Sequence, residues 1–273
     1  MLMKSLTTAN LLSFPPSKSR YRSLMLRTSL VLMALTFSQT AAAITTKNVT
    51  YTVDNQPYEG YYAKADKANA PFILLIHDWD GLTDYERKRA DMLAAEGYNV
   101  LAADLFGQGI RPTNIEDNKR LTGELYNDRS KMRRLLQGAL NAGQQQGNNV
   151  REGVTMGYCF GGTVALELAR SGFPQKAFVP FHGAFDIPTG QSYDKTTGEI
   201  LVFHGSADDS VSLESFATLS KTLEAAKVPH EMVTYSGAPH AFSVFGSDRY
   251  NARADERSWQ HYLDFLADKY KLP

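Results

Sequence analysis

A chain of 273 residues with 43% hydrophobic residues is long enough for one sizeable core, and its 29 basic and 29 acidic side chains give a formal charge of zero. The two signs are mixed along the chain and no basic stretch is interleaved with aromatic residues, which argues against a nucleic-acid-binding protein. The single cysteine, Cys159, excludes an internal disulfide, so this residue serves either packing or chemistry.

The N-terminal segment has the pattern of a secretory signal peptide. Residues 1–24 carry basic and no acidic side chains, the apolar run LVLMALTF covers residues 30–37, and small residues precede a cut after Ala43. The alternative is a buried or membrane-anchoring N-terminal helix, but the apolar run is too short to span a bilayer. We predict that residues 1–43 are removed, whether translation starts at Met1 or Met25. The mature protein is then expected in the periplasm or outside the cell, and in the cytoplasm if the segment is not processed.

After the signal segment, two alternating stretches predict an antiparallel hairpin. They are KNVTYTV and YEGYYAKA, which flank DNQP. Beyond them, short continuous apolar runs alternate with helical patterns. The predicted strands cover residues 72–77, 98–104, 153–158, 176–182, 199–205 and 228–235. The predicted helices cover residues 87–97, 115–146 with a possible break at Gly123, and 161–171, with two more around Leu219 and Tyr262.

Apolar strands separated by helices indicate a mostly parallel sheet that is covered on both faces. The chain shows no internal repeat and no linker, so residues 44–273 are predicted to form one domain. Ligands of such sheets bind at the carboxyl ends of the strands. Functional side chains are therefore expected in the loops at that edge.

Cys159 lies in GYCFGG, between a predicted strand and a predicted helix. Gly157 and Gly161 allow the two elements to approach closely around a sharp turn. This is the nucleophile elbow, G-x-S-x-G, with cysteine in place of serine. The N-terminus of the following helix is expected to face the thiol and to favour the thiolate. Taken alone, the pattern also fits a small buried residue that closes a strand.

A cysteine nucleophile needs a base that takes its proton and an acid that orients the base. On this kind of sheet the order along the chain is nucleophile, acid, base. Asp208 and Asp209 follow one predicted strand, and His240 follows the next. Each of these residues alone would be an ordinary loop residue, but order and strand position together predict a triad with Cys159.

Residues 72–266 resemble the dienelactone hydrolase family of α/β-hydrolases. The similarity lies in IHDWDGL, GYNVLAADLFG, MGYCFGG, FHGSADDSV, APHAF and ADERSW. It implies an α/β-hydrolase fold and a triad of Cys159, Asp208 and His240, without a cofactor. Asp208 is favoured over its neighbour because the family pattern is G-x-x-D-x-x-V, which here begins at Gly205.

The resemblance also implies an oxyanion hole. Its donors would be the backbone N–H groups of Trp79 and Phe160. The family places an acid beside the resting thiol, commonly a glutamate. Asp78 occupies that position, and its shorter side chain raises the question of whether it reaches the sulfur.

Three histidines follow apolar strands and could converge at the same sheet edge: His77, His182 and His204. A zinc site is one interpretation. We favour supporting polar residues beside the triad, because the sequence has no H-x-x-x-H or similar ligand spacing. No metal is therefore predicted.

Dienelactone hydrolase itself binds its substrate's carboxylate with arginines, one of them four residues after the catalytic histidine. Here that position is Val244. We expect Trp79, Phe242 and Val244 to contact substrate, with Arg120 or Arg249 as candidate substitutes for the missing arginine. Neutral short-chain or aryl esters should then be cleaved better than carboxylate-bearing lactones.

The leading hypothesis is a hydrolase that cleaves an ester or lactone of a small molecule through an acyl-enzyme. A thioesterase or peptidase that uses the same triad is the second enzyme hypothesis. A non-catalytic member that binds a small molecule or a protein in the pocket is the alternative from a different class. The protein is expected to be a monomer.

Overall fold

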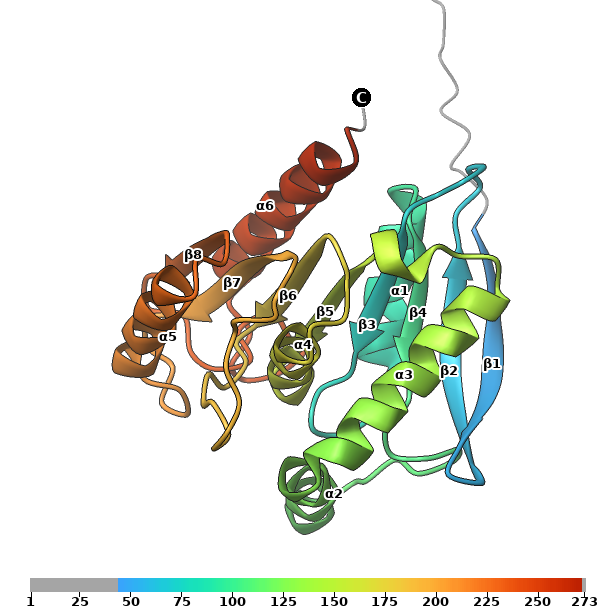
Figure 1. Cartoon of the computed structure of the whole chain (residues 1–273), viewed down its shortest axis with the longest axis horizontal. Helices are drawn as coiled ribbons and strands as arrows, with labels where there is room; N and C mark the ends of the chain where they lie inside the picture. Colours follow the sequence, from blue (N-terminus) through green and yellow to red (C-terminus); the bar gives the residue numbers. More distant parts are fainter. Residues whose placement is uncertain (1–43, 272–273) are drawn as a thin grey trace, which may run out of the picture. The chain divides into compact units, whose positions relative to one another are not determined.

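The computed structural model describes residues 44–271, and the predicted signal segment lies outside these residues (Figure 1). Eight strands form one sheet in the order β1-β2-β4-β3-β5-β6-β7-β8. Within residues 44–271, no helix is both long and apolar enough to cross a membrane.

The predicted hairpin is present at one edge of this sheet. β1 (Thr45–Val53) and β2 (Gln56–Lys64) pair antiparallel along their whole length. Asp54 and Asn55 connect them with φ angles of 50° and 61°, as a type I′ turn requires. β2 also pairs antiparallel with β4, which joins the hairpin to the rest of the sheet.

The remaining strands are parallel to one another, as predicted from their continuous apolar runs. All residues of β3, β5 and β6 are buried, because helices cover both faces of the sheet. The six parallel strands are β3 (Phe72–Ile76), β4 (Asn99–Ala103), β5 (Val154–Tyr158), β6 (Ala177–Phe181), β7 (Glu199–Gly205) and β8 (His230–Tyr235).

The apolar side chains form two clusters, one on each face of the sheet. Residues of α3, α4 and α5 belong to one cluster, and residues of α1 and α6 belong to the other. The helices are α1 (Asp84–Ala95), α2 (Ile115–Asn127), α3 (Arg129–Gln145), α4 (Phe160–Arg170), α5 (Leu213–Ala225) and α6 (Ala252–Tyr270), with a 3₁₀ turn at Val150–Glu152.

The long helix predicted over residues 115–146 is two helices, and the predicted break point was wrong. Gly123 lies inside α2, whereas the chain breaks at Asp128, which has φ −118° and ψ 79°. The Asp128 side chain accepts a hydrogen bond from the Lys131 N–H and so caps the start of α3. The aspartate stabilises a new helix start, whereas a single glycine inside a helix is tolerated at a cost of about 1 kcal/mol.

Candidate active site

A cavity of about 660 Å³ lies at the carboxyl edge of the parallel strands. Its wall includes Cys159 after β5, Asp78 and Trp79 after β3, and His240 and Val244 after β8. These segments are far apart in the sequence. The parallel topology brings them to one edge, as the sequence predicted.

The turn that carries Cys159 is tightly packed against its neighbours. Cys159 has φ 49° and ψ −110°, an unusual conformation for a residue with a side chain. A Cβ atom added to Gly157 would lie 2.3 Å from the carbonyl carbon of Gly161, and one added to Gly161 would lie 2.3 Å from the Ile76 oxygen. Both positions therefore require glycine.

The three residues of the predicted triad lie within contact distance of one another. His240 Nε2 is 3.1 Å from Cys159 Sγ, and His240 Nδ1 is 2.8 Å from Asp208 Oδ2. The other carboxylate oxygen of Asp208 accepts hydrogen bonds of 2.8 Å from the N–H groups of Ser210 and Val211. Although burial opposes ionisation, the bond and charge of His240 hold the pKa of Asp208 below its usual value.

The N-terminus of α4 favours the thiolate, as expected, but two other features of the site outweigh it. The pKa of Cys159 lies well above its usual value, first because the sulfur is buried and second because the Asp78 carboxylate faces it. The N–H of Phe160 at the start of α4 bonds the sulfur and lowers this pKa, but the effect is smaller. Burial and the Asp78 carboxylate therefore oppose ionisation of the sulfur more strongly than the Phe160 N–H favours it.

Asp78 does reach the sulfur, which the sequence had left open. Burial raises the pKa of Asp78 to about 6, and the hydrogen bond from the Cys159 thiol partly opposes this shift. Asp78 Oδ1 also accepts a hydrogen bond from the Trp79 N–H. Of the two predicted oxyanion donors, Phe160 therefore faces the sulfur, whereas Trp79 is occupied by Asp78.

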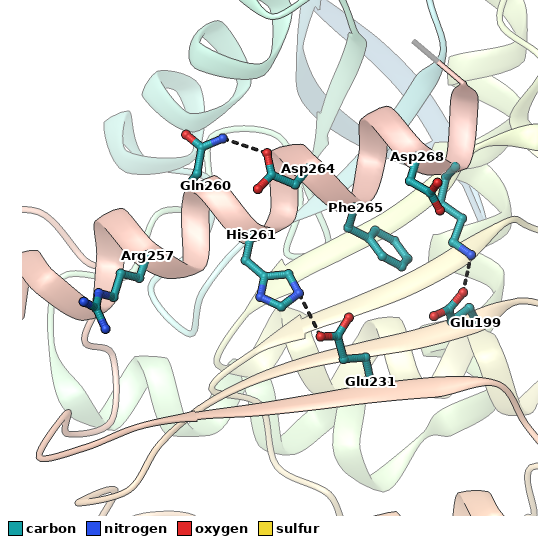
Figure 2. Close-up of a pocket in the computed structure, with 9 residues that line it drawn as sticks. Glu199, Glu231, Arg257, Gln260, His261, Asp264, Phe265 and Asp268 are labelled. Carbon is teal, nitrogen blue, oxygen red and sulfur yellow. Dashed lines mark hydrogen bonds and ion pairs between the residues drawn. The ribbon is translucent and has the colours of Figure 1, made fainter. Parts of the chain in front are cut away.

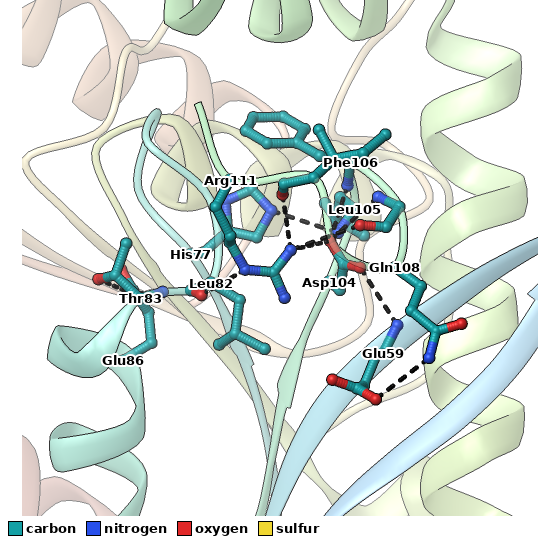
Figure 3. Close-up of polar contacts among 12 residues, drawn as sticks. Glu59, His77, Leu82, Thr83, Glu86, Asp104, Leu105, Phe106, Gln108 and Arg111 are labelled. Atoms are coloured by element: carbon teal, nitrogen blue, oxygen red, sulfur yellow. Dashed lines mark hydrogen bonds and ion pairs between the residues drawn. The ribbon is translucent and has the colours of Figure 1, made fainter. Parts of the chain in front are cut away.

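His77 and Asp104 fix the loops behind the cavity (Figure 3). His77 Nδ1 donates to the Asp78 carbonyl over 2.6 Å, and His77 Nε2 accepts from the Leu105 N–H over 3.2 Å. Burial lowers the pKa of His77 to about 4, so the ring is neutral. Asp104 accepts hydrogen bonds from the N–H groups of Glu59 and Phe106.

The other two predicted histidines have separate surroundings. His182 lies against Cys159 and His240, with its ring 5.3 Å from that of His240. His204 is packed between Phe185 and Phe216, and neither of its ring nitrogens has a hydrogen-bond partner in the described part of the chain. Across residues 44–271, no group of three or more His, Cys, Asp or Glu side chains is arranged to hold a metal ion.

Two of the predicted substrate contacts need correction. Phe242 is fully buried beneath the His182 ring and does not line the cavity. Arg120 projects from α2 with 56% of its side chain exposed and pairs with Asp117 and Glu124 instead.

Trp79, Val244 and Arg249 do line the cavity. Sequence reasoning missed several other lining residues, among them Asp80 and Tyr126. Asp80 was within the quoted IHDWDGL stretch and only two residues beyond Asp78, so the loop itself was a signal. Tyr126 lies in α2, and no local sequence pattern indicates which face of that helix lines the cavity.

A second cavity of about 610 Å³ lies between α6 and the edge strand β8 (Figure 2). Its wall is mostly charged, and the pairs across it include His261 Nε2 with Glu231 Oε1 at 3.0 Å and Lys269 with Glu199. None of the residues that surround Cys159 contributes to it. It is therefore separate from the candidate active site.

The sheet order, the flanking helices and the cysteine turn define an α/β-hydrolase. Residues 58–270 match the model of the dienelactone hydrolase family. The chain belongs to this family.

Named relatives and solved structures agree with this assignment. A carboxymethylenebutenolidase from Rhodococcus opacus is 25% identical over 236 residues, which cover 81% of this chain and 89% of that protein. The crystal structure of a dienelactone hydrolase-like promiscuous phosphotriesterase from metagenomic libraries is 28% identical with a TM-score of 0.76, and the match covers 83% of this chain and 98% of that one. An esterase from Thermogutta terrifontis shares the fold, with a TM-score of 0.61, 17% identity and coverage of 84% of this chain and 92% of that one.

Proposed function

We propose that the protein hydrolyses an ester or lactone of a small molecule through an acyl-enzyme on Cys159. The observation that carries the proposal is the continuous contact from Asp208 through His240 to the sulfur, at the wall of a cavity of about 660 Å³. A volume of this size suits a small organic ligand. The family and the carboxymethylenebutenolidase relative support the same reaction class.

In the first half-reaction, His240 Nε2 takes the thiol proton and the sulfur attacks the substrate carbonyl. The imidazolium is stabilised by the Asp208 carboxylate, as in other triads. The Phe160 N–H binds the oxyanion, joined by the Trp79 N–H once the Asp78 carboxylate releases it. Collapse of the intermediate expels the alcohol, which takes its proton from His240 Nε2.

In the second half-reaction, water attacks the thioester carbonyl and gives a proton to His240 Nε2. The carboxylic acid leaves and the proton returns to the sulfur, so the free thiol is restored. The same sequence of steps would serve a thioesterase, and an amide would require stronger protonation of its leaving group. An ester is therefore the first substrate to test.

The proposal is tested with a chromogenic aryl ester and a thiol reagent. Wild-type protein should turn over the ester and lose activity when one equivalent of reagent modifies Cys159. Cys159→Ala and His240→Ala should each remove nearly all turnover while circular dichroism stays unchanged, because triad residues act as a unit. A folded wild-type protein that binds but never cleaves esters, lactones and thioesters would instead identify a non-catalytic binding protein.

The cavity charges support a preference for neutral substrates. Among its described lining residues, Arg249 is the single Arg or Lys and its side chain is exposed, whereas Asp78 and Asp80 provide two carboxylates. Val244 adds an apolar wall where the family has an arginine. A charge-assisted bond of that kind contributes about 1.5–3 kcal/mol, so its absence lowers kcat/KM for an anionic substrate roughly ten- to a hundredfold.

Kinetics on a matched pair, a free acid and its methyl ester, test this preference. The methyl ester should have the higher kcat/KM, and Val244→Arg should narrow the gap. A clear preference for the free acid would contradict the expectation and would assign Arg249 as the anion-binding residue.

A further inference from the structure

His182 connects the backbone of Cys159 to the loop that carries His240. The Cys159 N–H lies 2.9 Å from the Phe181 carbonyl, its partner in the sheet, and 3.2 Å from His182 Nδ1. His182 Nε2 is 2.9 Å from Ser243 Oγ. Because Nδ1 accepts, the ring proton is on Nε2 and is donated to the serine.

The His182 ring is held neutral and in a fixed orientation. Burial, and then the charge of His240, keep the pKa of His182 well below its usual value. Its ring meets that of His240 edge to face at 5.3 Å. A neutral ring in this place supports the His240 imidazole without repelling the imidazolium that forms during catalysis.

Ser243, the other end of the connection, is itself anchored. It is fully buried, and its hydroxyl lies 3.0 Å from the Tyr85 hydroxyl. Its carbonyl accepts a hydrogen bond of 2.9 Å from Arg89, which forms a buried ion pair with Asp255. The His240 loop is thereby tied to α1 and α6, three residues beyond His240.

We infer that His182 is a positioning residue that sets the distance between Cys159 Sγ and His240 Nε2. This inference rests on the proposed function, because the distance between Cys159 Sγ and His240 Nε2 matters only if His240 takes the proton from the thiol. Cys159 and His182 both have positive φ angles, 49° and 41°, so the two neighbouring turns after β5 and β6 each depend on the contacts around them. A displacement of about 1 Å in such a pair lowers catalysis on the order of a hundredfold.

Two substitutions of His182 separate its two hydrogen bonds. His182→Asn keeps an acceptor near the Cys159 N–H but does not reach Ser243, and asparagine tolerates a left-handed φ. His182→Gln keeps a donor near Ser243 but loses the acceptor. Each variant should lower kcat by about ten- to a hundredfold with little change in KM, because the bond between the two segments is lost in both.

Ser243→Ala removes one atom from the same connection and should reproduce the effect of His182→Asn. The double variant should be no slower than either single variant, as expected for residues that act through one contact. His261→Gln, on the surface of α6, is the matched histidine control and should keep wild-type kinetics. If His182→Asn fails to fold, the kcat and KM of Ser243→Ala are compared with those of wild type instead.

Alkylation of Cys159 by iodoacetamide provides a readout that needs no substrate. The rate should fall in His182→Asn and in Ser243→Ala, with a shifted pH profile, because His240 no longer takes the thiol proton from the correct position. Folded variants with wild-type alkylation profiles and kcat, or additive effects in the double variant, would overturn the inference. If wild-type protein cleaves no ester, the proposed function fails, but the alkylation comparison still decides the role of His182.

Discussion

Asp208 and Asp209 are chain neighbours with different surroundings. The Asp208 side chain is buried against His240, whereas Asp209 is exposed and its carboxylate accepts a hydrogen bond from the Ser210 hydroxyl. Asp208→Asn should lower kcat by about 10³–10⁴-fold, because the amide cannot stabilise the imidazolium or hold its tautomer. Asp209→Asn is the matched control and should change kcat by less than about twofold, as surface substitutions usually do. Steady-state kinetics on the same ester decide this, and a reversed ranking would assign the orienting acid to Asp209.

The surroundings of the Cys159 sulfur affect how the proposed reaction would begin. A buried sulfur beside the Asp78 carboxylate resists ionisation in the free protein. In the proposed reaction, proton transfer to His240 would follow the arrival of substrate, whose carbonyl oxygen would replace the Asp78 carboxylate at the Trp79 N–H.

At the scale of elements, the start of α1 positions the loop that carries Asp78. Thr83 and Glu86 form a capping box, and the Glu86 carboxylate also accepts a hydrogen bond of 3.2 Å from the Asp78 N–H. Burial raises the pKa of Glu86 from 4.5 to about 8. The cap thus links helix stability to the geometry of the site.

The raised pKa of Glu86 predicts how stability depends on pH. In this range the folded state binds the Glu86 proton more tightly than the unfolded state does, so stability falls as pH rises from 4.5 to about 8. Denaturant unfolding across this range should show a shallower decline for Glu86→Gln than for wild type. Glu96→Gln, at an exposed position after α1, should retain the wild-type slope. Equal slopes for Glu86→Gln and wild type would show that folding does not raise the pKa of Glu86.

Elements with a strong local pattern could be predicted from the sequence. β3, β5 and β6 are mostly apolar along their whole length, which is the pattern expected of strands that are buried on both faces. The boundary between α2 and α3 was missed, because an aspartate cap within a polar helix has a weak signal. Cys159 and His240 were predicted from the glycine-flanked turn and the order of the strands, and Asp208 was chosen over Asp209 from the resemblance to the family pattern. Tyr126 and the neighbours of His182 depend on how helices and loops pack across the sheet, which no local spacing encodes.

For the whole molecule, the hairpin at the sheet edge is joined to the elements that surround the cavity. Tyr51 of β1 donates a hydrogen bond of 2.5 Å to the Asp104 carbonyl beside the loops of the site. Val49 and Val53 are buried in the same apolar cluster as α3. β1 is therefore part of the domain that holds the cavity, and its first residue is Thr45.

The position of β1 fits removal of residues 1–43 by a signal peptidase. A cut after Ala43 would leave Ile44 as the first residue and every hydrogen bond of β1 with β2 intact. We expect protein recovered from the cell envelope to have the intact mass of a chain that begins near Ile44. A purified chain that begins at Ile44 should unfold at the same temperature as that recovered protein, since both would contain the whole described domain. Processing would be contradicted if the chain recovered from the cytoplasm retained Leu30–Phe37. The apolar run would then belong to the functional protein.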